Sequence, residues 1–221
     1  MPYKLSPTSI KLMKGCHRCF WLHYNKGIKR PETPFPTLPA GMDRILKEHF
    51  DSFIGKGLPP ELQGLENIKL FDGMELLEVW RNNLKGIQWT DRKGNLFRGA
   101  VDNILQKDGK LIVLDYKTRG YPLKEDTAES YQDQLDIYNF LLRKNGFETE
   151  DYGFLLFYHP DKVNGNGDVV FHKELVKMEI DVGNAENKFK EALEILDGKM
   201  PKHSEECGFC KWAGDNNFDK E

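Results

Sequence analysis

Acidic residues are missing from the first 30 positions of the chain, which carry seven lysines and arginines and no aspartate or glutamate. Because the formal net charge of the whole chain is −3, residues 1–30 carry +7 and residues 31–221 carry −10. The near-neutral total excludes a uniformly basic nucleic-acid-binding surface, but it leaves a basic arm at the N-terminus. Such an arm can contact phosphates, and it can equally be a solvated helix face.

Long apolar runs are also missing. No segment approaches the roughly 18 consecutive apolar residues of a membrane helix, and the first twenty residues have no signal-peptide core. We therefore expect no membrane partner and a cytoplasmic location. Low-complexity tracts and internal repeats are absent as well, and 39% of the 221 residues are hydrophobic. A chain of this length can bury a sizeable core, so we expect a single domain over residues 1–221.

The expected helices and strands are interleaved along the chain. Ser6 and Pro7 are typical of a helix start, and further helices are predicted at 40–53 and 73–84, after a proline-rich loop at 31–39. Turn sequences separate three predicted strands that should pair antiparallel, at 87–91, 96–106 and 110–118. A helix at 125–145, strands at 151–159 and 169–180, and a helix at 182–196 follow. This order predicts an α/β (α+β) fold with a central mixed β-sheet flanked by helices.

Two acidic residues and a lysine interrupt the apolar strands. Asp115 and Lys117 are two residues apart, so they face the same side of the predicted strand. Asp102 lies on the preceding hairpin arm, where pairing can place its carboxylate beside that of Asp115. Two carboxylates at that distance repel each other unless a cation lies between them, and Mg²⁺ prefers oxygen ligands.

A magnesium ion at this position would activate a water molecule for phosphodiester hydrolysis, while Lys117 orients the water or neutralises developing charge. The alternative is that Asp115 and Lys117 form a structural pair and Asp102 is a turn residue.

These residues resemble the PD-(D/E)XK nuclease superfamily. The segment 99–104, Gly-Ala-Val-Asp-Asn-Ile, precedes a hairpin and an apolar strand that ends with residues 115–117, Asp-Tyr-Lys. Gln134 and Tyr138 are similar to the Gln-x-x-x-Tyr motif of the RecB-like branch, to which CRISPR-associated exonucleases belong. Their spacing puts both on one helical face, where the alternative role is helix packing.

The resemblance implies a restriction-endonuclease-like core and a DNA nuclease that uses Mg²⁺ or Mn²⁺, acting as an exonuclease more readily than as an endonuclease. It implies metal ligation by Asp102 and Asp115, with the backbone carbonyl of Tyr116 as a further ligand. Catalysis would rest on these two acids together with Lys117, Gln134 and Tyr138.

RecB-like members often place a further metal ligand on an early helix, and the candidates here are Asp43, Glu48 and His49. The family usually has a histidine shortly after a glycine, and here Asp43 follows Gly41 in that neighbourhood, so we select Asp43. His49 lies on the apolar face of its helix, where a core histidine is the more common case.

We expect DNA as the partner, single-stranded or at its ends. Five basic residues are the candidate contacts: Lys11, Lys14, Arg18, Arg98 and Arg119. Aromatic residues of the basic arm, Phe20, Trp21 and Tyr24, can stack on unpaired bases or pack in the core.

Cysteine is scarce: Cys16, Cys19, Cys207 and Cys210 form two Cys-x-x-Cys pairs at opposite ends of the chain. Two such pairs can complete a tetrahedral four-sulfur metal site, which would pack the basic arm at 1–30 against the tail at 200–221. Disulfides and free thiols are the alternatives. RecB-like nucleases often hold an iron–sulfur cluster between the chain ends, but with one cysteine plus three rather than two plus two. We select an iron–sulfur cluster, with zinc as the alternative.

Two other functions compete with DNA hydrolysis. The chain can be a non-catalytic nucleic-acid-binding module with the same fold and a structural metal. It can also be another metal-dependent hydrolase, although the sequence has no His-rich ligand set.

Overall fold

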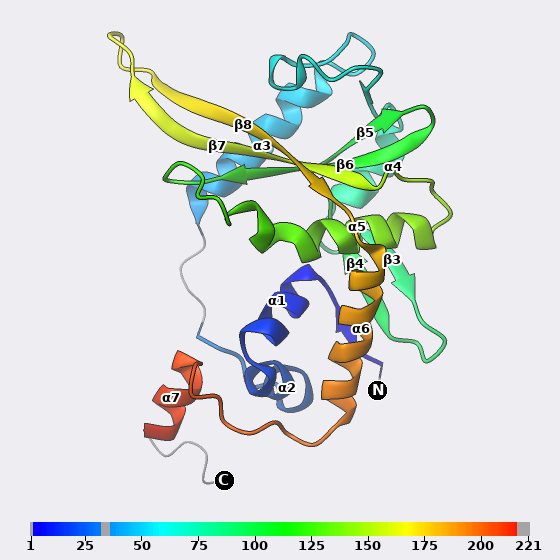
Figure 1. The fold of residues 1–221 in the computed structure, drawn as a ribbon, viewed down its shortest axis with the longest axis vertical. Coiled ribbons are helices and arrows are strands. Elements are labelled where there is room, and N and C mark those ends of the chain that lie inside the picture. The colour runs from blue at the N-terminus through cyan, green and yellow to red at the C-terminus, as the bar shows by residue number, and fades with distance from the viewer. Residues whose placement is uncertain (1, 32–35, 216–221) are drawn as a thin grey trace.

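The computed structural model describes residues 2–31 and 36–215 (Figure 1). The helices are α1 (Pro7–Gly15), α2 (His17–Lys26), α3 (Thr37–Asp51), α4 (Met74–Arg81), α5 (Gln132–Lys144), α6 (Val182–Asp197) and α7 (Gly208–Asp215), with 3-10 turns η1 (Pro60–Leu62) and η2 (Ala128–Tyr131). The strands are β1 (Lys4–Leu5), β2 (Lys69–Leu70), β3 (Ile87–Thr90), β4 (Leu96–Gly99), β5 (Asn103–Lys107), β6 (Lys110–Thr118), β7 (Tyr152–Val163) and β8 (Val169–Glu179).

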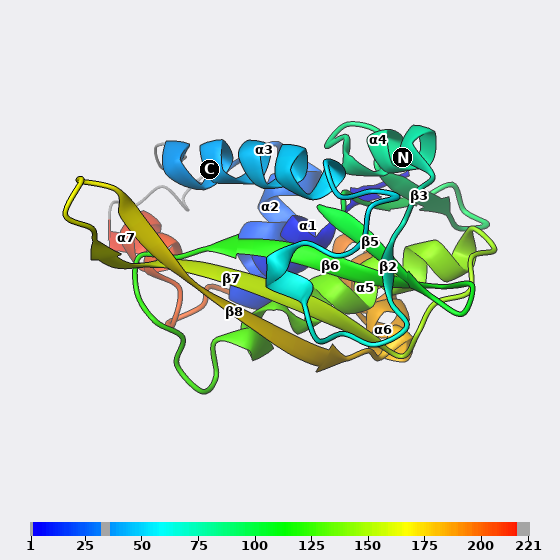
Figure 2. The ribbon, with the colours of Figure 1, turned by 90° about the horizontal axis from the view of Figure 1, so that it is seen from above.

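A five-stranded sheet in the order β2-β5-β6-β7-β8 forms the centre of the fold. Strands β6 and β7 are parallel and the other neighbours are antiparallel, which confirms the predicted mixed sheet. Figure 2 shows α3 on one face of this sheet and α5 with α6 on the other. The predicted α/β architecture, a central sheet flanked by helices, is therefore confirmed.

The alternation of side chains along β6 gives each face of the sheet its own core. Tyr116 packs on the α3 side, where its ring lies 4.9 Å from that of Phe50, centroid to centroid. Val113 belongs to the core on the α5 side together with Leu135. Odd-numbered residues of β6 therefore face α5, and this places Asp115 and Lys117 beneath that helix.

The prediction of one strand over 96–106 was wrong, because the chain leaves one sheet and enters another within this segment. Strand β4 belongs to a three-stranded sheet, pairing parallel with β1 and antiparallel with β3. At the break, the N–H of buried Val101 donates to the carbonyl of Trp80 in α4 at 3.2 Å instead of to a strand. Two hairpins in different sheets replace the expected three-stranded run.

Three helix boundaries also differ from the prediction. Helix α3 begins at Thr37, within the expected loop 31–39, and Pro39 fits in its first turn because no intrahelical donor is lost there. Residues 32–35 of that loop lie outside the described residues. Helix α5 begins at Gln132 rather than near 125, after a turn in which the Lys124 N–H donates to Thr127 Oγ1 at 2.9 Å. Helix α4 ends at Arg81 rather than 84.

The first and last parts of the described chain lie together. Figure 1 shows α7 beside α2, away from the five-stranded sheet, and α6 alongside α1 and α2. The Arg18 guanidinium donates to the carbonyl of Pro201 at 3.1 Å, and Trp21 Nε1 donates to that of Gly198 at 3.1 Å. None of the described helices has the length and apolarity needed to cross a membrane.

Candidate active site and cysteine cluster

Strand β6 presents Asp115 and Lys117 side by side to helix α5. Asp115 is only 1% exposed, and its carboxylate forms an ion pair with the Lys117 ammonium. Gln134 of α5 contacts both residues: its amide NH₂ donates to Asp115 Oδ1 at 3.1 Å and its carbonyl accepts from Lys117 Nζ at 3.0 Å. The acid, the amine and the amide thus hold one another in a fixed arrangement.

Tyr138 extends this network by one turn of α5. Gln134 Nε2 lies 2.6 Å from the Tyr138 hydroxyl oxygen, as the four-residue spacing predicts for neighbours on one helical face. Tyr138 is 4% exposed, so its ring also packs in the core. The structure therefore brings Gln134 and Tyr138 to Asp115 and Lys117, and the packing and polar roles occur together.

Asp102 immediately precedes β5, across the hairpin from Asp115. The pairing of Asn103 with Leu114 sets a register that, continued by one residue, places Asp102 opposite Asp115. The backbone N–H of Tyr116 donates to Asp102 Oδ2 at 2.9 Å. Arg81 of α4 donates to the Asp102 carbonyl at 2.7 Å and so fixes its backbone. The two predicted acids therefore meet at one end of the hairpin.

Burial makes charge at this site costly. Burial and the neighbouring charge of Asp115 raise the pKa of Asp102 to about 7. Burial also raises the pKa of Asp115, although the Lys117 ammonium opposes the increase. For Lys117, burial alone would lower the pKa, but attraction by Asp115 and Asp102 leaves it raised. A divalent cation would offset the repulsion between two such carboxylates, so this donor set fits Mg²⁺ or Mn²⁺.

Asp43 does not join the two acids directly. It lies on α3, over the opposite face of the sheet from α5, and its carboxylate binds Lys47 Nζ at 2.8 Å. Lys47 also lies 3.3 Å from Asp102 Oδ1, so its ammonium connects the two carboxylates. Sequence reasoning missed Lys47, because its contact with Asp102 joins residues 55 positions apart and no local pattern indicates it.

The other early-helix candidates point elsewhere. Glu48 is exposed and pairs with Arg44 along the same helix at 2.8 Å. His49 Nε2 lies 3.1 Å from the carboxylate of Glu61, and its ring packs edge-on against Phe53. His49 is therefore a partly buried, paired histidine outside the candidate active site.

The predicted DNA contacts fall in three places. Lys11, Lys14 and Arg98 line a cleft of about 660 Å³ that Gln134 and Tyr138 also line. Arg18 lies near the cysteines, and Arg119 follows β6, where its N–H donates to the carbonyl of Tyr158 at 2.8 Å.

The aromatic residues of the arm mostly serve packing. Phe20 is fully buried and Tyr24 packs against it, with 5.0 Å between the ring centroids. Trp21 is partly buried, and its ring N–H donates a hydrogen bond to the carbonyl of Gly198. Core packing therefore accounts for Phe20 and Tyr24, rather than stacking on bases.

Gly99 allows Tyr138 to pack against the backbone of β4. A Cβ added at Gly99 would lie 2.7 Å from the tyrosine ring and 3.2 Å from a methyl group of Leu141. We expect Gly99→Ala to lower the free energy of unfolding by about 1–3 kcal/mol, the usual range for overpacking. Urea denaturation measures this loss. Gly165→Ala is the matched control, because a Cβ there has no neighbour within 4 Å; an equal effect of both changes would contradict the packing argument.

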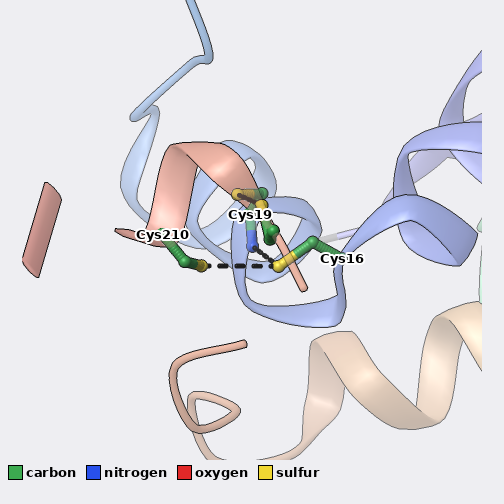
Figure 3. A group of neighbouring side chains, drawn as sticks. Cys16, Cys19 and Cys210 are labelled. Carbon is green, nitrogen blue, oxygen red and sulfur yellow. Dashed lines mark hydrogen bonds between the residues drawn. The ribbon is translucent and has the colours of Figure 1, made fainter. Parts of the chain in front are cut away.

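The four cysteines form a compact cluster between α2 and α7. Figure 3 shows three of them, Cys16, Cys19 and Cys210. Cys16 Sγ lies 3.6 Å from Cys210 Sγ, Cys19 Sγ lies 3.7 Å from Cys207 Sγ, and all four sulfurs are within 4.8 Å of one another. None of the four forms a disulfide, so the disulfide alternative does not describe this structure. Among the described residues this is the only group of three or more metal-ligating side chains this close together.

The surroundings of the cluster favour one thiolate, that of Cys207, whereas burial raises the pKa of Cys19 and of Cys210. Arg30 Nη2 donates to Cys207 Sγ at 3.4 Å, and its guanidinium lies 4.6 Å from the centre of the Phe209 ring. Burial opposes ionisation of Cys207, but the backbone N–H groups of Cys210 and Phe209 lower its pKa to about 7. The donor set, the spacing and the N–H contacts therefore fit a bound metal.

Most of the chain matches the model of a known protein family. A family model described as the PD-(D/E)XK nuclease superfamily matches residues 45–214. This span includes Asp102, Asp115, Lys117 and the second cysteine pair, and it begins after Asp43 and the first pair. No curated protein matches the chain.

Proposed function

Because the chain belongs to the PD-(D/E)XK nuclease superfamily, we propose that it is a metal-dependent nuclease that hydrolyses the phosphodiester bonds of DNA. The observation that carries the proposal is the convergence of Asp102, Asp115 and Lys117 at one end of the β5–β6 hairpin, with Gln134 linking the last two. Structural ion pairs rarely need a second, half-buried acid next to the first, whereas a metal site does.

The chemistry follows from what each side chain can do. Asp102 and Asp115 would hold Mg²⁺ or Mn²⁺, with the carbonyl of Tyr116 as a further ligand, and the bound ion supplies Lewis acidity toward water and phosphate. Lys117 remains protonated beside Asp115, so it can donate hydrogen bonds to the attacking water or to a phosphoryl oxygen. Gln134 fixes the positions of Asp115 and Lys117, and Tyr138 positions Gln134.

We assign the chain to the RecB-like branch and favour exonuclease over endonuclease activity. The support for the branch is the position of Gln134 and Tyr138 on the helix that follows the strand bearing Asp115 and Lys117. The DNA would be single-stranded or enter at an end, since the basic residues beside this network line a cleft rather than an open face.

For the cysteine cluster we propose a single tetrahedral metal ion, zinc, in preference to the iron–sulfur cluster expected from the family resemblance. With Zn–S bonds of about 2.3 Å, tetrahedral geometry separates the ligand sulfurs by about 3.8 Å. The observed separations of 3.6 and 3.7 Å are close to that value. Cysteines around a cluster of several irons and sulfides must stand farther apart, because the inorganic atoms lie between them. Anaerobically purified protein should be colourless and contain one zinc per chain; a brown sample with iron and sulfide would contradict this assignment.

Cleavage assays test the proposed nuclease activity. Labelled single-stranded, double-stranded and circular DNA are incubated with Mg²⁺, Mn²⁺ or EDTA. We expect metal-dependent release of short products from linear DNA and much slower cleavage of circles. Cleavage that persists in EDTA would contradict the metal-dependent mechanism. DNA binding without cleavage in either ion would instead assign the chain as a non-catalytic nucleic-acid-binding module.

Lys47 should compete with the divalent ion for the carboxylates of Asp43 and Asp102. Removing a positive charge several ångströms from a divalent cation strengthens cation binding by about 1–1.5 kcal/mol even at the dielectric constant of water, which is about tenfold in Kd. We therefore expect Lys47→Met to lower the Kd for Mn²⁺ about tenfold in calorimetric titration. Lys162→Met, on the exposed part of β7, is the control for net charge. An unchanged or weaker Mn²⁺ affinity in Lys47→Met would show that its ammonium does not oppose the metal.

A further inference from the structure

A cleft of about 660 Å³ opens directly beside the candidate active site. Its walls come from three parts of the chain that are distant in sequence: the start of α1, the segment 83–86 with the end of β4, and the region where η2 meets α5. Figure 1 shows α1 lying below α5 and near β4 in this arrangement. Gln134 and Tyr138 belong both to this lining and to the network of Asp115 and Lys117. A molecule in the cleft therefore reaches the catalytic side chains.

Positive charge dominates the cleft. Four cationic residues line it, Lys11, Lys14, Lys85 and Arg98, against one carboxylate, Asp133. Lys14 is paired with that carboxylate, and Arg98 donates to the carbonyl of Leu84 at 2.6 Å. Lys11 and Lys85 are exposed, and the ammonium group of neither has a hydrogen-bond or ion-pair partner within residues 2–31 and 36–215. Lys85 forms hydrogen bonds only through its backbone, to the side chains of Asn82 and Gln88. Two unpaired ammonium groups facing one cleft indicate an anionic ligand that would neutralise them.

The dimensions decide which anionic ligand fits. A volume of about 660 Å³ is typical of a pocket that encloses a drug-sized molecule, which is the scale of one or two nucleotides. A B-form duplex, whose major groove alone is about 12 Å wide, is too large to enter such a space. A single strand has its phosphates exposed along one edge and fits a narrow basic groove.

Two segments that line the cleft, at Gly86 and Gly99, approach each other closely through their backbones. Gly86 has a φ of +62°, and a Cβ at this position would lie 2.3 Å from the carbonyl oxygen of Gly99. Tyr131 also lines the cleft, and the centre of its ring lies 4.5 Å from Lys117 Nζ. One aromatic ring therefore contacts both the cleft and the catalytic lysine.

We propose that this cleft binds one nucleic-acid strand immediately next to the scissile phosphate, with backbone phosphates on Lys11, Lys85 and Arg98. The inference rests on the proposed nuclease function and specifies its substrate: an unpaired strand, so that a duplex must separate at its end before it is cut. The geometry of the cleft adds Lys85 and Tyr131 to the substrate-binding residues. No sequence motif contains either residue.

Fluorescence anisotropy with a labelled single-stranded oligonucleotide, without added Mg²⁺ or Mn²⁺ and without a chelator that would strip the cysteine cluster, measures binding without cleavage. The Lys11→Ala/Lys85→Ala variant removes both unpaired ammonium groups, and Lys107→Ala/Lys162→Ala removes the same charge from hairpin positions outside the cleft. We expect the cleft variant to bind the oligonucleotide about tenfold more weakly than the control variant. The slope of log K against log salt concentration should fall in magnitude by about 1.4, since each phosphate contact on a single strand contributes about 0.7. A blunt duplex should bind the wild-type protein much more weakly than the single strand does.

Two results would overturn the inference. One is equal single-strand affinity and equal salt slope for the cleft and control variants. The other is wild-type affinity for the blunt duplex that matches its affinity for the single strand. Neither depends on catalysis, because the binding measurements contain no added Mg²⁺ or Mn²⁺. A wild-type protein that fails to cleave with Mg²⁺ or Mn²⁺ would refute the proposed function separately, whatever the binding results are.

Discussion

Asp115→Asn is expected to reduce the rate of DNA cleavage by about 100- to 1,000-fold, which is the scale of loss when a group that stabilises transition-state charge is removed. The change keeps the shape of the side chain but removes one of two acidic metal ligands. It also removes the counter-charge that orients Lys117. Single-turnover cleavage of an end-labelled single strand at saturating Mg²⁺ measures the effect. A wild-type cleavage rate in this variant would show that Asp115 takes no part in catalysis.

Loss of folding must be separated from loss of chemistry, because Asp115 and Lys117 form a buried ion pair. Breaking such a pair leaves one charge without a partner and costs about 3–5 kcal/mol. The matched variant Asp115→Asn/Lys117→Met removes both charges and should therefore melt closer to the wild type than Asp115→Asn does. Thermal unfolding followed by circular dichroism gives both melting temperatures. We expect the double variant to be folded and inactive, so that inactivity cannot be attributed to unfolding.

The core of this site could be predicted from the sequence because it depends on short-range geometry. Side chains two apart on a strand share a face, and a hairpin turn aligns residues at equal distances from it. Those two rules place Asp115 beside Lys117 and Asp102 opposite Asp115. Gln134 and Tyr138 follow from the helical repeat.

The parts that could not be predicted depend on packing between distant segments. The strand expected at 96–106 divides because Val101 bonds to Trp80, a contact that no local pattern encodes. Lys47 reaches Asp102 from another layer of the fold, and Lys85 joins Lys11 across a cleft that exists only after three segments assemble. Asp43 stays a predicted ligand: its charge acts on both Asp102 and Asp115, and Lys47 connects its carboxylate to that of Asp102.

The cysteines were predictable for a different reason, namely that their number and spacing left few alternatives. Two Cys-x-x-Cys pairs with no fifth cysteine can satisfy one four-coordinate ion, although almost the whole chain separates them. The spacing alone does not identify the metal, and the short distances between sulfurs supply the argument for zinc.

Removal of the metal from the cysteine cluster is expected to lower the melting temperature by roughly 8–16 °C. A ligand at 1,000 times its Kd contributes about 4 kcal/mol to stability, and each kcal/mol shifts the melting temperature of a chain of this size by about 2–4 °C. Protein stripped with a chelator under reducing conditions and then desalted is compared with the zinc-bound form. The Cys207→Ser/Cys210→Ser variant should melt where the stripped protein melts and should not respond to the chelator.

Hydrogen exchange shows which parts of the chain lose stability when the metal is removed. The cluster joins α2 to α7, so amide protection should fall in those helices and in α1, which packs against α2. Strands β6 and β7 have their own core on both faces of the sheet and should keep their protection. Equal loss of protection in β6 would mean that the cluster supports the whole fold rather than the chain ends. Since α1 forms one wall of the strand-binding cleft, the stripped protein should also bind the single-stranded oligonucleotide more weakly, even though Asp102, Asp115 and Lys117 remain in place.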